Sequence, residues 1–113
     1  MPPRKNPLNL NALQLKTLTL LQAIAGLPEY TRPGEEAGSI LISPPDPHGD
    51  HFHLGDAVVA ARDASGLRNP GVWMALERKG LIRSMYPFGA VLTPLGRDYQ
   101  TGLRDVLLHR GSH

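Results

Sequence analysis

The chain has 113 residues, a formal net charge of +2 at neutral pH and no cysteine. A chain of this length forms one domain with a modest core, and its aromatic content of 5% is more typical of a helical protein than of a β-sandwich. The composition excludes disulfides and thiolate metal sites, no apolar run approaches the ~18 residues of a membrane span, and the small net charge does not by itself indicate a nucleic-acid partner.

The first predicted element is an amphipathic helix over residues 10–25. Asn11 and Gln14 have the spacing of an N-x-x-Q capping box, in which each side chain binds the backbone of the other residue. Leucines and small apolar residues then recur at helical spacing, and Gly26 ends the pattern. Residues 1–9 contain no apolar signal core, so we expect a flexible basic arm and no secretion signal.

Residues 27–53 form a long segment rich in proline and glycine. Only its middle is apolar enough for a strand, and we expect residues 40–42 to pair with a hairpin further along the chain. A loop of this length in a small domain is usually either functional or disordered.

Histidine and aspartate alternate at the end of this long loop. The set consists of Asp46, His48, Asp50, His51 and His53. Imidazole and carboxylate groups at this spacing suit zinc or nickel. However, a loop rich in proline and glycine does not hold ligands in place, and ordering them costs conformational entropy. We therefore expect a solvated loop with no bound metal.

The sequence contains no recognisable catalytic motif. It has no glycine-rich phosphate loop after a strand, no nucleophile elbow and no HExxH helix. Glu35 and Glu36 are neighbours in a loop flanked by glycine, which favours a solvated turn over an acid–base pair. We expect a protein that is not an enzyme and that carries no catalytic residue and no cofactor.

A second helix is predicted over residues 55–65, with Val58, Ala61 and Ala64 facing inward. Gly66 ends it, and the next helix follows after a short turn, which is the spacing of a helix-turn-helix.

The third helix has clear signals at both ends. Asn69 can cap it, and Pro70 then occupies the first helical position, where its missing N–H has no cost. Gly80 follows the last helical residues and can adopt the left-handed conformation. A strand over 81–85, a tight turn at 87–89 and a second strand over 90–93 come next.

The last predicted helix begins at Pro94, after a cap at Thr93, and runs to the end of the domain. Its apolar positions are Leu95, Tyr99, Leu103, Val106 and Leu107. We expect the first two to cover the core. The others either form a homodimer seam or fold back onto the first helix. Residues 109–113 resemble the start of a purification tag, so we place the domain at 1–108.

The segment LERKGLIR, followed by a short hairpin and LTPLGRDY, resembles the winged helix-turn-helix family of bacterial transcriptional regulators, especially its MarR-like and PadR-like branches. Their pattern is a recognition helix ending in LExxGLI, then a hairpin, then LTxxG. The resemblance covers residues 8–108. It implies an α+β winged helix-turn-helix with a three-helix core, a small antiparallel sheet and a C-terminal helix. It also implies a cytoplasmic DNA-binding regulator without a membrane segment.

In this alignment the third helix buries Val72, Trp73 and Leu76 and leaves Pro70, Gly71, Met74, Ala75 and Arg78 outward. Such a surface offers little for reading base edges, which requires polar or basic side chains. We therefore expect low-specificity binding of double-stranded DNA, mainly through phosphates. The expected DNA-binding residues are Arg68, Asn69, Arg78, Lys79 and Arg83, with Arg4 and Lys5 in the basic arm.

The alternative is a winged helix that has lost DNA binding and associates with proteins through Met74, Tyr86 and Phe88. The tip of the predicted wing is aromatic and apolar, unlike the basic tips that enter a DNA groove. Phe88 either presents its ring to a partner or folds back over the core.

Overall fold

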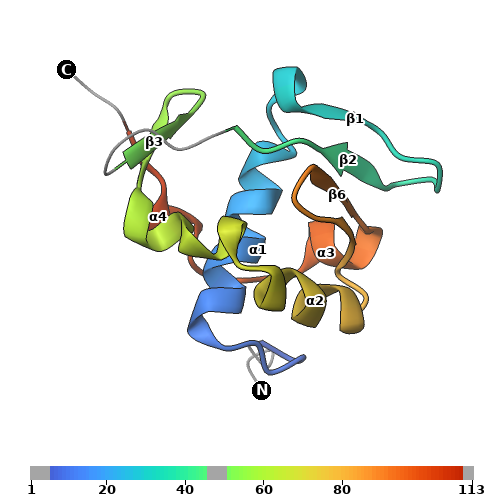
Figure 1. The fold of residues 1–113 in the computed structure, drawn as a ribbon. Helices are drawn as coiled ribbons and strands as arrows, with labels where there is room; N and C mark the ends of the chain where they lie inside the picture. The colour runs from blue at the N-terminus through green and yellow to red at the C-terminus, as the bar shows by residue number, and fades with distance from the viewer. Residues whose placement is uncertain (1–5, 46–50, 111–113) are drawn as a thin grey trace.

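The computed structural model describes residues 6–45 and 51–110, and Figure 1 shows their arrangement. In chain order, the elements are α1 (Ala12–Ile24), the 3-10 helix η1 (Pro28–Tyr30), β1 (Thr31–Pro33), β2 (Ile40–Ile42), β3 (His51–Leu54), β4 (Ala57–Ala60), the 3-10 helix η2 (Ala61–Arg68), α2 (Pro70–Arg78), β5 (Ile82–Met85), β6 (Gly89–Leu92), α3 (Pro94–Asp98), α4 (Arg104–Leu107) and β7 (His109–Arg110). The result is an α+β fold with helices packed against small antiparallel sheets.

Helix α1 is the centre of the core, and its predicted start is confirmed. The Asn11 side chain accepts a 2.8 Å hydrogen bond from the Gln14 backbone, and the Asn11 backbone donates one of 3.0 Å to the Gln14 side chain. Four α1 residues, Leu18, Leu20, Leu21 and Ile24, have no exposed surface. A local capping box therefore positions the most buried helix of the molecule.

The predicted pairing of residues 40–42 with the hairpin is also confirmed. The main sheet has the order β1-β2-β6-β5 and is antiparallel throughout. Ile40 lies opposite Leu92, and Ile42 lies opposite Ala90. Ile42, Ala90 and Leu92 are fully buried, so one face of this sheet closes the core.

The predicted helix over 55–65 is wrong. Its first half is strand β4, which forms a hairpin with β3, and its second half is η2. Gly55 has a φ of +60° in the two-residue turn between the strands, which is the backbone that tight hairpins require. The buried valine is Val59, whereas Val58 is half-buried, because side chains alternate along a strand.

The second sheet brings in the end of the chain, in the order β3-β4-β7. His109 and Arg110 pair with Val58 and Ala57 of β4, although the sequence placed residues 109–113 outside the domain.

The predicted long C-terminal helix is broken. Tyr99 has an extended backbone and Gly102 a φ of +73°, so two short helices, α3 and α4, replace it. The cause is tertiary: the Gln22 side chain of α1 donates 2.8 Å hydrogen bonds to the carbonyls of Gly96 and Tyr99. These bonds hold residues 96–99 against α1, whereas a straight helix would carry the chain away from α1.

The side chains of this region divide between its two alternatives, with Val106 60% exposed. Leu107 is 1% exposed in the shared core, and α4 packs against α1, so the segment returns within the molecule. Tyr99 is buried, as expected, but Leu95 is 51% exposed and does not cover the core.

Candidate nucleic-acid interface

Helix α2 occupies the position predicted for a recognition helix. The Asn69 side chain accepts hydrogen bonds from the backbone N–H groups of Gly71, at 2.9 Å, and Val72, at 3.4 Å. Pro70 is the first helical residue, and Gly80 ends the helix with a φ of +78°. Because these signals act within a few residues, both ends of α2 agree with the sequence.

Trp73 anchors α2 to its neighbours. It is 1% exposed, and its indole nitrogen donates a 3.0 Å hydrogen bond to the carbonyl of Gly66 in η2. Its ring meets Tyr86 edge to face, with the centroids 5.2 Å apart. The Tyr86 hydroxyl in turn donates a 2.8 Å hydrogen bond to the carbonyl of Arg68. The tryptophan is thus a core residue, as predicted, and the hairpin tip is tied to the start of α2.

The outward face of α2 carries the residues that the sequence placed there. Pro70, Gly71 and Arg78 are exposed, and Met74 is 57% exposed. Ala75 is half-buried. Apart from Arg78 near its end, this face offers no group that could form a hydrogen bond to a base edge.

The basic groups around α2 differ in their surroundings. Arg68 and Arg78 are exposed at its two ends. The Lys79 ammonium donates a 2.9 Å hydrogen bond to the carbonyl of Leu8, which keeps its charge but fixes its direction. The side-chain oxygen of Asn69 accepts the hydrogen bonds that cap α2. Arg62 of η2 is also exposed, and it was not among the predicted DNA-binding residues.

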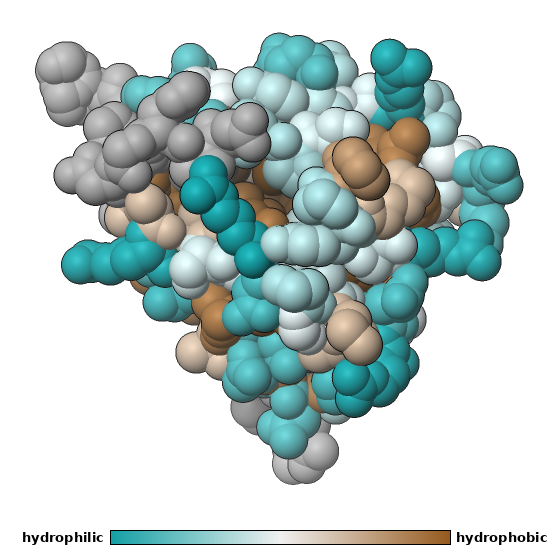
Figure 2. Space-filling model, viewed as in Figure 1, coloured by the Kyte–Doolittle hydropathy of each residue, from teal (hydrophilic) through white to brown (hydrophobic). Residues whose placement is uncertain are grey.

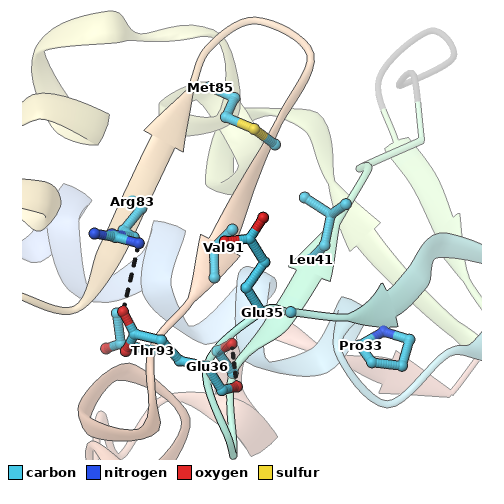
Figure 3. Close-up of a pocket in the computed structure, with 10 residues that line it drawn as sticks. Pro33, Glu35, Glu36, Leu41, Arg83, Met85, Val91 and Thr93 are labelled. Carbon is cyan, nitrogen blue, oxygen red and sulfur yellow. Dashed lines mark hydrogen bonds and ion pairs between the residues drawn. The ribbon is translucent and has the colours of Figure 1, made fainter.

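Arg83 belongs to a different surface. It lies beside Val91 and Leu41 in one row across the sheet, on the opposite face from the buried Ile82. There it lines a hollow of about 200 Å³, and its guanidinium lies 3.4 Å from a Glu36 carboxylate oxygen (Figure 3). Both side chains are about two-thirds exposed, so this ion pair contributes little stability. The structure does not bring Arg83 together with Arg68 and Arg78.

The carboxylates between residues 61 and 80 are already engaged. Asp63 forms a 3.1 Å ion pair with Lys16 of α1. The Glu77 side chain accepts a 2.9 Å hydrogen bond from the backbone N–H of Ser84, at the open edge of β5. Glu77 keeps its negative charge beside Arg78, but the four cations of this segment outnumber its two carboxylates.

The three residues predicted for a protein-binding surface, Met74, Tyr86 and Phe88, differ in their exposure. Phe88 is 82% exposed at the tip of the hairpin, which rules out its folding back over the core. Tyr86 is half-buried against Trp73 and so is not part of an open patch. Figure 2 shows apolar residues as separate patches among polar ones on the face in view. Of the three predicted residues, only Met74 and Phe88 are available to a partner.

The histidine loop lies mostly outside the described residues, which exclude Asp46, His48 and Asp50. His51 and His53 lie on strand β3. Within the described ranges, no group of three or more His, Cys, Asp or Glu residues could hold a metal ion. The predicted lack of metal binding stays a prediction.

Comparison of the chain with models of protein families, with curated proteins and with solved structures finds no match. In the part of the chain that the structure describes, no helix has the length and apolar character needed to cross a membrane.

Proposed function

We propose that this chain is a small winged helix-turn-helix regulator that binds double-stranded DNA in the cytoplasm. The observation that carries the proposal is the pair of exposed guanidinium groups, Arg68 and Arg78, at the two ends of α2. The nearby carboxylates, Asp63 and Glu77, are held by Lys16 and by the Ser84 backbone. The four cations between residues 61 and 80 outnumber these two carboxylates, which leaves a local excess of positive charge suited to phosphates.

The arrangement of elements supports the same proposal. The pair η2 and α2 corresponds to the helix-turn-helix, the hairpin β5–β6 to the wing, and α3 to the helix after the wing. Strand β2 lies in the chain between α1 and η2 and pairs with the wing strand β6. One difference from the family plan is the hairpin β3–β4, which replaces the first half of the second helix.

Helix α2 offers few side chains that could recognise particular DNA bases. Base recognition uses side-chain donors and acceptors at the start of the recognition helix. Here that position holds Pro70 and Gly71, followed by Met74. Arg68, Arg78 and Lys79 then contact phosphates, and the gap between specific and random DNA is small.

The test is a salt titration of binding to a mixed-sequence duplex, followed by fluorescence anisotropy. Log affinity should fall with log salt by about 0.9 per neutralised phosphate. The double variant Arg68→Gln/Arg78→Gln should bind every sequence more weakly and flatten the slope by roughly two units. The matched control, Arg32→Gln/Arg83→Gln, removes the same charge from the β1–β5 sheet and should leave the slope unchanged. Equal effects of the two double variants would refute an interface at α2.

The second candidate is a winged helix that associates with proteins. The observation in its favour is the exposure of Phe88, at 82%, and Met74, at 57%. Large apolar side chains of this kind are typical of the centre of protein interfaces. This candidate predicts no binding to duplex at low salt. It also predicts self-association, seen by analytical ultracentrifugation, that disappears in Met74→Ser/Phe88→Ser.

A further inference from the structure

A cleft lined by arginines lies at the C-terminal end of α1, away from the outward face of α2. It has a volume of about 280 Å³ and is lined by Gln22, Ala25, Gly26, Ile40, Leu92, Arg97 and Arg104. Arg97 and Ile40 also line an adjoining hollow, which adds Arg32 from β1. Figure 1 shows the elements involved: the C-terminal end of α1 lies next to β2, and in this view α1 stands between α4 and α3.

The walls of the cleft carry positive charge without a balancing acid. No Asp or Glu of the described residues lines either hollow. Asp98 and Asp105 are exposed neighbours of the two arginines in the chain, but neither faces the cleft. The C-terminal end of α1 contributes a partial negative charge of roughly half an elementary unit. Two full guanidinium charges exceed it, so the cleft remains positive.

Hydrogen bonds fix the positions of two residues that line the cleft, Arg97 and Gln22. The Arg97 guanidinium donates a 2.7 Å hydrogen bond to the carbonyl of Gly38, which leaves its remaining N–H groups available. Gln22 ties the second half of α3 and the residue that follows it to α1 through the carbonyls of Gly96 and Tyr99. Arg104 is exposed and forms no ion pair within the described residues. One arginine is thus positioned in advance, and the second is free to close on a ligand.

We propose that this cleft binds a small oxyanion, a carboxylate or phosphate group, between Arg97 and Arg104. The planar guanidinium group matches both anions through paired hydrogen bonds. Ile40, Leu92 and Ala25 supply an apolar floor that suits a ligand with a short hydrocarbon body. The site does not depend on the proposed DNA binding, because it uses none of the residues around α2.

The experiment follows backbone amide shifts of the full chain by NMR during separate titrations with inorganic phosphate, acetate and hexanoate. Sodium chloride keeps the ionic strength constant, so general screening is removed from the comparison. Saturable shifts should centre on Gly26, Leu92 and Arg97. Tighter binding of phosphate identifies a phosphate ligand, whereas tighter binding of hexanoate than of acetate identifies an apolar carboxylate.

Substitutions test whether Arg97 and Arg104 bind the oxyanion. Arg104→Gln should weaken binding about tenfold or more, since charge-assisted hydrogen bonds are the strong ones; the fold should be kept, because the exposed Arg104 side chain forms no ion pair within the described residues. Arg97→Gln should weaken it as well, and its spectrum reports whether the loss of the Gly38 bond disturbs the loop. Arg78→Gln on α2 removes the same charge and should change nothing. Shifts that match sodium chloride alone, or an affinity unchanged in Arg104→Gln, would overturn the proposal.

Discussion

The indole nitrogen of Trp73 and the carbonyl oxygen of Gly66 are joined by a 3.0 Å hydrogen bond that connects α2 to η2. Gly66 is also buried, and a Cβ atom at this position would collide with the Thr17 hydroxyl on α1. Three helical elements therefore meet at a residue that has no side chain. The position of the proposed recognition helix depends on this contact.

Replacing Gly66 by alanine should lower the free energy of unfolding by ~1–3 kcal/mol, as other overpacked substitutions do. Thr17 cannot rotate away freely, because its hydroxyl donates a 2.8 Å hydrogen bond to the Leu13 carbonyl. Urea denaturation measures the change. Gly26→Ala is the control, since its nearest neighbour is a carbonyl 3.4 Å away, and it should have little effect. A loss of the same size in both variants would contradict the close contact at Gly66.

Truncating Leu76 to alanine should cost ~2–5 kcal/mol, the range for leucines in a packed core. Leu76 is fully buried in α2, whereas Leu95 in α3 is 51% exposed. Leu95→Ala removes the same atoms from the surface and should change stability by less than ~0.5 kcal/mol. Thermal and urea unfolding of the two variants, measured side by side, test the burial directly. Similar losses would mean that α2 does not face the core as described.

Asn69 allows stability and DNA binding to be separated. Asn69→Ala removes the cap of α2 and should cost ~1 kcal/mol. Asn69→Asp keeps a cap acceptor and adds a negative charge near the helix N-terminus, so stability should be retained or slightly raised. The same charge lies next to Arg68 and should weaken DNA binding. Circular dichroism melting and anisotropy on the same samples give both values; undiminished affinity in Asn69→Asp would place the DNA elsewhere.

Tyr86 and Phe88 are close in the hairpin tip but should respond differently to substitution. Tyr86→Phe loses the 2.8 Å hydrogen bond to the Arg68 carbonyl, which should cost ~0.5–1.5 kcal/mol. Phe88→Ser changes a side chain that is 82% exposed, and its effect should stay within ~0.5 kcal/mol. Denaturant midpoints compare the two. A large loss in Phe88→Ser would show that the ring packs against the protein.

The elements that the sequence determined correctly are those whose signals act locally. The Asn11–Gln14 box, the Asn69 cap with Pro70, and the Thr93 cap all join residues within three positions of each other. Gly80 ends α2 for an equally local reason, because its φ of +78° is strained for other residues. The candidate site followed in part: the resemblance to the winged-helix family placed Pro70, Gly71, Met74 and Arg78 outward, and these residues are exposed.

Tertiary structure decided what depended on distant partners. A helix was predicted at 55–65, yet β4 pairs with β3 and with β7, whose residues lie about fifty positions later in the chain. The C-terminal helix was broken by Gln22, which binds carbonyls more than seventy positions away. Arg83 was assigned to the DNA surface, but strand alternation places it on the outer sheet face beside Glu36. For β4 and the C-terminal helix the local preference was weak, and sheet pairing or long-range hydrogen bonds prevailed over it. The outer position of Arg83 follows from alternation along a strand that was itself predicted correctly.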